Sequence, residues 1–126
     1  MPTFSFTAPV LGTSDPMGLA RFYQRLLGWP LGSGGDEEDP TWVTLRDEGG
    51  RQLSFQLEAE HVPPVWPAHA GDQQMQLHLD IEVDDLAAAV GVAVEAGATV
   101  AEFQPQDDVR VLLDPAGHPF CLWVRG

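Results

Sequence analysis

The sequence feature that most constrains the fold is an internal repeat. Two stretches follow one another with the same order, an extended segment, a helical segment and then several short extended segments. The helical segments open at Asp15 and Asp85 and close at Gly28 and Gly97. Aspartate caps the N-terminus of a helix, and glycine accepts the left-handed conformation that ends one. The repeat therefore predicts an α+β fold built from two tandem βαβββ modules.

We expect a single domain over residues 1–126, with module one at about 1–59 and module two at about 76–126. Between them, residues from about 60 to 75 are rich in proline and are predicted to form an irregular linker. Helices are predicted at 15–27 and 85–97, the second packing through Leu86, Val90 and Val94. Eight strands are predicted, at 4–12, 29–31, 41–46, 52–58, 76–83, 99–103, 109–113 and 119–124.

Side-chain alternation along the strands predicts which residues face away from the helices. In 76–83 the apolar set, which includes Leu79 and Ile81, packs on the helix. The opposite set is Gln76, His78, Asp80 and Glu82. The same reasoning places Phe6, Ser54, Gln56, Cys121 and Trp123 on the open faces of their strands.

Three motifs carry a resemblance to a known family. They are DPMGLARFYQRLLGW (15–29), HLDIEVDDL (78–86) followed by Gly97-Ala98, and DPAGHPFCL (114–122). In this order the chain resembles the glyoxalase/bleomycin-resistance/extradiol-dioxygenase superfamily, also called vicinal oxygen chelate proteins. The resemblance covers essentially the whole chain. It implies curved mixed sheets that enclose a cleft between the modules, but one fold hosts many chemistries.

The resemblance also raises the question of a metal. Metal-dependent relatives place a His, Gln or Glu ligand on the first and the fourth strand of each module. The matching positions here are Ala8, Ser54, His78 and Cys121. Alanine has no donor atom and a neutral serine is a poor ligand. We therefore expect no tightly bound catalytic metal. If a divalent ion binds, His78 is the best ligand, and Glu58 or Asp80 can help if they share the cleft.

Charge and cysteine content exclude several classes of partner. The chain has 19 acidic residues, six arginines and no lysine, which gives a formal net charge of −13. Nucleic acids and anionic membranes both require a basic surface, so neither is expected as a partner. The acidic residues serve solubility, or they suit a cationic ligand. One cysteine allows no intrachain disulfide and suits the cytoplasm.

Two functions from different classes fit these residues. The first is binding of a small organic molecule in the cleft, without a catalytic metal. The second is a metal-dependent lyase, isomerase or dioxygenase that uses His78; a domain without any ligand is a third, weaker alternative. Relatives often complete their clefts across two chains, which implies a homodimer. The expected ligand-binding residues are Phe6, Ser54, Gln56, Trp66, Gln76, His78, Cys121 and Trp123.

Some of these residues have structural alternatives. Cys121 lies between apolar neighbours, which favours a small buried side chain over a nucleophile. Trp66 lies in the proline-rich linker, where its amphipathic ring either covers a pocket or anchors the linker or a dimer interface. His78 serves either as a site residue or as a hydrogen-bonded wall of the cleft.

Overall fold

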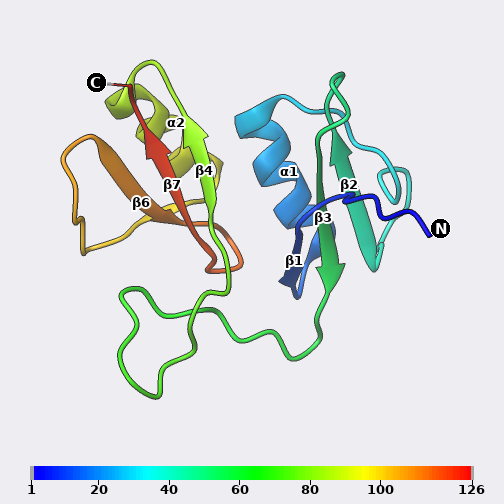
Figure 1. Cartoon of the computed structure of the whole chain (residues 1–126), viewed down its shortest axis with the longest axis horizontal. Helices are drawn as coiled ribbons and strands as arrows, with labels where there is room; N and C mark the ends of the chain where they lie inside the picture. Colours follow the sequence, from blue (N-terminus) through cyan, green and yellow to red (C-terminus); the bar gives the residue numbers. More distant parts are fainter. Residues whose placement is uncertain (1, 126) are drawn as a thin grey trace. The chain divides into compact units, whose positions relative to one another are not determined.

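The computed structural model describes residues 2–125. The chain forms two compact units that divide between His61 and Val62. Figure 1 colours the first unit from blue to green and the second from green to red. Each unit contains one helix and one mixed sheet, and each is described by itself below.

The first unit contains β1 (Val10–Thr13), α1 (Pro16–Leu27), β2 (Trp42–Arg46) and β3 (Gln52–Leu57). Its sheet has the order β1-β3-β2. Strand β1 runs parallel to β3, and β2 runs antiparallel to it. The connection from β1 to its parallel neighbour passes through α1, as a crossover between parallel strands requires.

Local chemistry explains why α1 begins and ends where it does. The Asp15 side chain accepts a hydrogen bond from the Gly18 backbone N–H at 3.0 Å, and Pro16 occupies the first helical turn. At the other end, Gly28 adopts φ 72° and donates its N–H to the Gln24 carbonyl at 2.8 Å. The caps predicted from the sequence therefore set both helix ends.

One face of α1 covers the sheet and forms the core of this unit. Tyr23 is fully buried and stacks on Phe55 of β3, with ring centroids 5.8 Å apart. Burial of such apolar area supplies most of the stability of a small unit. The other buried apolar residues of α1, β2 and β3 are Leu19, Ala20, Phe22, Val43, Leu45 and Leu53.

The second unit contains β4 (Leu79–Glu82), α2 (Leu86–Ala96), β5 (Thr99–Val100), β6 (Val109–Leu113) and β7 (Pro119–Trp123). Its sheet has the order β4-β7-β6-β5. Strand β4 runs parallel to β7, whereas β6 is antiparallel to both β7 and β5. The arrangement confirms two tandem modules of the predicted α+β class.

Helix α2 packs through a different residue from the one predicted. Its Asp85 cap accepts the Ala88 N–H at 3.1 Å, as expected. Ala93 is fully buried, whereas Val94 is 46% exposed. Seven residues are closer than eight to two full helical turns, so Ala93 rather than Val94 shares a face with Leu86. No helix within residues 2–125 is long and apolar enough to span a membrane.

Two predicted strands are shorter than expected for the same reason. Predicted strand 4–12 is reduced to β1, and Phe4 and Phe6 are 92% and 89% exposed. Predicted strand 76–83 is reduced to β4, which leaves Gln76 and His78 outside it. Because β1 and β4 pair in parallel with β3 and β7, residues 4–7 and 76–77 run past the starts of those partners, and His78 lies beside Pro119, which has no N–H to donate. A segment without a neighbouring strand loses its ladder of hydrogen bonds.

Smaller differences affect two other predicted strands. Predicted strand 29–31 is a single bridge between Leu31 and Leu45. Predicted strand 99–103 is limited to Thr99–Val100. Residues 2–125 therefore contain seven strands rather than eight. The remaining predicted strands match β2, β3, β6 and β7 to within one residue at each end.

The segment between β3 and β4 has no helix or strand. Its later part belongs to the second unit, where Trp66 donates its indole N–H to the Phe103 carbonyl at 3.3 Å. The two rings lie 6.1 Å apart at an interplanar angle of 44°. This contact holds the Trp66 side chain against the second unit.

Candidate functional site

The face of the second sheet that points away from its buried core carries the candidate site. In β7, Phe120 and Leu122 are buried, while Cys121 and Trp123 alternate with them and are half-buried. Cys121 pairs with Asp80 of β4 on one side and with Val111 of β6 on the other. Because paired residues share a face, these three side chains lie side by side.

Three possible metal-ligating or proton-transferring groups gather at this point. The His78 Nε2 atom lies 3.6 Å from an Asp80 carboxylate oxygen. Within the described part of the chain, one donor atom each from His78, Asp80 and Cys121 lies within 4.8 Å of the others. His78 comes immediately before β4, and the parallel pairing with β7 brings it beside the start of that strand.

The surroundings of Cys121 keep its thiol protonated. Burial raises the pKa of the thiol, and the Asp80 carboxylate raises the pKa further through its negative charge and through a hydrogen bond. The thiolate is the reactive form of cysteine. The raised pKa of the thiol therefore favours Cys121 as a lining residue of the site over Cys121 as a nucleophile.

We expect Asp80→Asn to speed the reaction of Cys121 with Ellman's reagent severalfold at pH 8. Removing the carboxylate charge lowers the pKa of the thiol, so a larger fraction is thiolate at a fixed pH. The chain has one cysteine, so the absorbance trace reports this thiol alone. Asp84→Asn removes the same charge elsewhere in the unit and should leave the rate unchanged. An equal or slower rate in Asp80→Asn would contradict this assignment.

A small hollow, which we call the apolar hollow, adjoins the three groups. Its volume is about 190 Å³. The Trp66 ring, held by Phe103, forms one wall. An apolar enclosure with few polar groups is typical of small-molecule sites. Its lining residues are Trp66, Met75, His78, Pro105, Gln106, Val109, Val111, Pro119 and Cys121.

A second hollow, which we call the acidic hollow, shares part of the same wall. Its volume is about 280 Å³. Its own lining residues include two carboxylates, Asp80 and Asp108, and the ring of Trp123. The residues that line both hollows are His78, Gln106, Val109 and Cys121. The two hollows are therefore adjoining parts of one surface depression in the second unit.

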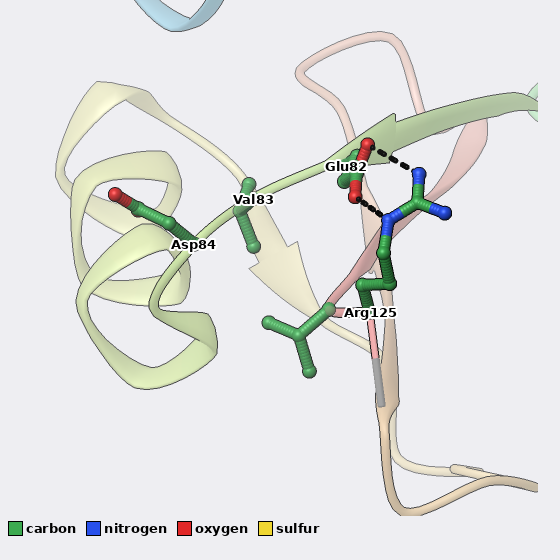
Figure 2. Close-up of a pocket in the computed structure, with 5 residues that line it drawn as sticks. Glu82, Val83, Asp84 and Arg125 are labelled. Carbon is green, nitrogen blue, oxygen red and sulfur yellow. Dashed lines mark hydrogen bonds and ion pairs between the residues drawn. The ribbon is translucent and has the colours of Figure 1, made fainter.

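A larger depression, of about 410 Å³, lies elsewhere in this unit and is a poorer candidate. Figure 2 shows Glu82 and Arg125 bound to each other there, with Asp84 pointing away from them. The Arg125 Nε atom lies 2.9 Å from a Glu82 carboxylate oxygen, and a second bond measures 3.2 Å. The charges of Glu82 and Arg125 at this open depression already satisfy each other, and none of its described lining residues is aromatic.

The structure divides the predicted site residues between the two units, and within the second unit it separates Gln76 from the rest. His78, Cys121, Trp123 and Trp66 come together at the two hollows. Gln76 is exposed in the segment before β4 and lines neither hollow. The other three, Phe6, Ser54 and Gln56, belong to the first unit.

In the first unit, Ser54 takes part in a polar chain on the sheet. Ser54 is 2% exposed, and its hydroxyl lies 3.0 Å from the Thr44 hydroxyl. The Trp42 indole N–H donates to the same Thr44 oxygen at 3.1 Å. Gln56 donates to the Glu58 carboxylate at 3.2 Å, and Phe6 is almost fully exposed. Ser54 and Gln56 thus have partners within their own unit.

The four positions that the resemblance assigns to a metal do not fit one here. Ala8 has no donor atom, and the Ser54 hydroxyl is bound to Thr44. The second unit supplies three donors instead of two, because Asp80 joins His78 and Cys121. The donor set therefore departs from the four-ligand pattern of metal-dependent relatives.

Sequence reasoning missed part of the lining of both hollows. Alternation along the predicted strand did place Asp80 on the same face as His78, because the two residues are two positions apart. The Met75 and Gln106 side chains come from irregular segments, where no periodicity predicts direction. Val109 and Val111 alternate along β6, and the pairing of β6 with β7 decides that they face Cys121 and Trp123.

Comparison with solved structures places this fold among known ones. A glyoxalase/bleomycin resistance protein/dioxygenase family enzyme from Burkholderia phytofirmans PsJN is similar with a TM-score of 0.66 and 21% identity, covering 94% of this chain and 96% of that one. An antibiotic-binding protein from Streptomyces sp. CB03234 is similar with a TM-score of 0.60 and 19% identity, covering 100% and 99%. A possible glyoxalase from Bacillus cereus has a TM-score of 0.66 and 13% identity, covering 96% and 99%.

These structural likenesses show the fold, and a sequence comparison shows the family. No curated protein matches the sequence. The model of the glyoxalase-like domain matches residues 8–123, which include both helices and all seven strands of the structure. The chain therefore belongs to the glyoxalase-like domain family, within the superfamily that its three motifs resemble.

Proposed function

We propose that the protein binds a small organic molecule at the apolar hollow of its second unit, without a catalytic metal. The observation that carries this proposal is the lining of that hollow. Apolar and aromatic side chains surround about 190 Å³, and His78 and Gln106 add polar groups that orient a ligand. The protonated thiol of Cys121 contributes to the lining of the hollow and does not act as a reactive group.

The comparisons support a binding role without naming a ligand. One protein of similar fold is named as an antibiotic-binding protein, and another as an oxidase. The same fold thus accompanies both binding and catalysis, so the residues of the site must decide between them. Here the site offers an apolar enclosure and a thiol whose pKa is raised, which favours binding.

Filling the apolar hollow tests this function. Val109 lines both hollows, so Val109→Phe should place a ring in the space that a ligand occupies. Fragments that bind the native protein in a nuclear magnetic resonance screen should bind Val109→Phe at least tenfold more weakly. Val92→Phe, at an exposed position of α2, is the matched control and should bind them as the native protein does. Equal loss in both variants, or no loss in Val109→Phe, would reject the hollow as the site.

A metal-dependent lyase, isomerase or dioxygenase that uses His78 is the second candidate. The observation in its favour is the grouping of His78, Asp80 and Cys121, since three protein ligands are enough for a catalytic zinc site. Elemental analysis of protein purified without an immobilised metal separates the candidates. We expect far less than one equivalent of metal. Near-stoichiometric metal that is lost in His78→Ala would promote the enzyme.

We also propose that the protein acts as a homodimer in the cytoplasm. Closed two-fold pairs are the commonest assembly of soluble proteins. The single cysteine suits a reducing compartment, where no disulfide is needed.

A further inference from the structure

The two adjoining hollows differ sharply in chemistry. The part that belongs to the apolar hollow alone is lined by Trp66, Met75, Pro105, Val111 and Pro119, none of which carries a charge. The part that belongs to the acidic hollow alone is lined by Asp80, Asp108 and Trp123. A molecule that spans the shared wall would therefore touch apolar side chains at one end and carboxylates at the other.

Within the described part of the chain, the residues that line the two hollows include no side chain with a permanent positive charge. The chain contains no lysine, and no arginine lines either hollow. Arg110 of β6 directs its guanidinium to the backbone carbonyls of Gln106, Asp107 and Val109. Arg125, which follows β7, binds Glu82, and its guanidinium carbon lies 5.6 Å from the centre of the Trp123 ring, which lines the acidic hollow. Both of these arginines thus have partners other than Asp80 and Asp108.

The other titratable groups at this wall leave its charge negative. The Cys121 thiol stays protonated, because burial and Asp80 raise its pKa, so it adds no charge. The His78 Nε2 atom lies 3.6 Å from an Asp80 carboxylate oxygen, and Asp108 lines the same hollow. The acidic hollow therefore presents the carboxylate of Asp108, together with that of Asp80, to an incoming molecule.

From this arrangement we infer the class of the ligand, an inference that rests on the proposed binding function. We propose that the ligand is a cationic amphiphile, with a small ring system in the apolar hollow and an ammonium or similar group at Asp80 and Asp108. A hollow of about 190 Å³ is smaller than the pockets that hold whole drug-sized molecules, so it suits a ring rather than a chain of rings. An anionic ligand would meet two carboxylates and no arginine.

Three matched probes test the sign of the charge. They are 2-naphthylmethylammonium, 2-naphthylmethanol and 2-naphthoate, which share a ring and differ in the charge of one substituent. Binding is followed at pH 7.5 by the indole N–H resonance of Trp66, assigned with Trp66→Phe. We expect the cation to bind about tenfold more tightly than the alcohol, and the anion to bind most weakly. The preference should shrink as salt is added.

Charge-removing variants locate the effect. The double variant Asp80→Asn/Asp108→Asn should bind the cation about as weakly as the alcohol, while its affinity for the alcohol stays unchanged. Asp107→Asn/Asp84→Asn removes the same number of negative charges at residues that line neither hollow, and should keep the preference. Circular dichroism and melting curves confirm that both double variants fold.

The possible outcomes distinguish a failure of the inferred ligand charge from a failure of the proposed binding function. If the alcohol or the anion binds as tightly as the cation, the hollow binds ligands but the inferred charge class is wrong. If no probe moves the Trp66 resonance, both the inference and the proposed site are overturned. If both double variants lose the preference equally, the effect comes from the net charge of −13 and not from this hollow, and the inference fails.

Discussion

Phe55→Ala is expected to lower the free energy of unfolding by about 3–5 kcal/mol, the usual cost of deleting a buried aromatic ring. Phe55 is fully buried in β3, and its ring stacks on Tyr23 of α1. The substitution removes this contact and leaves a cavity between the helix and the sheet, which the close-packed surroundings fill only in part.

Urea denaturation followed by far-ultraviolet circular dichroism measures this effect. The matched control is Phe6→Ala, because Phe6 is 89% exposed and its loss should change the free energy of unfolding by less than about 0.5 kcal/mol. A large loss in Phe6→Ala would show that the ring is covered in solution. A small loss in Phe55→Ala would contradict the packing of α1 on the first sheet.

Gly34→Ala is expected to destabilise the protein by about 2 kcal/mol more than Gly50→Ala. Both glycines have positive φ, 79° and 89°, so either alanine pays about 1–2 kcal/mol for a left-handed backbone. A methyl group at Gly34 would also overlap the Trp42 carbonyl oxygen, whereas one at Gly50 would meet open space. Forcing extra bulk into a packed site typically costs a further 1–3 kcal/mol.

The loop around Gly34 has little freedom to relax this overlap. Gly32 donates to the Thr44 carbonyl at 2.7 Å, and the Thr44 N–H donates to Ser33 at 3.0 Å. The same urea titration compares the two alanine variants with the native protein. Equal losses at Gly34 and Gly50 would show that the loop moves freely and that φ alone sets the cost.

The elements with a local signal were predictable from the sequence. Asp15 and Asp85 cap the two helices, and Gly28 and Gly97 end them, because these residues satisfy backbone groups that a helix leaves unpaired. Strands β6 and β7 were predictable for similar reasons, since the turn that begins at Asp114 separates them.

The lengths of β1 and β4 were not predictable from their own residues. Phe4 and Phe6 alternate with Ser5 and Thr7 as in a strand, yet a strand exists only where a neighbour pairs with it. The partner of β1 is β3, which lies more than 40 residues away in the sequence. No pattern in the residues around β1 predicts which residues of β3 they pair with.

The candidate site likewise combines residues that were predictable from the sequence with residues that were not. Strand parity places Cys121 and Trp123 on the open face of β7, and this face lines the hollows. Met75, Gln106 and Asp108 come from irregular segments, whose direction depends on contacts formed only after folding. The aromatic wall at Trp66 depends on such a contact, its hydrogen bond to Phe103.

The strand order of the second unit has a consequence for how the protein is made. Strand β7 lies between β4 and β6, although it is the last of the four strands in the sequence. During synthesis on the ribosome, β4 emerges about forty residues before its partner, so its backbone groups remain unpaired in the meantime. Such late, long-range pairing slows folding. Of the residues that line the acidic hollow, Cys121 and Trp123 are also the last to be translated, so the nascent chain has no complete hollow until β7 is inserted.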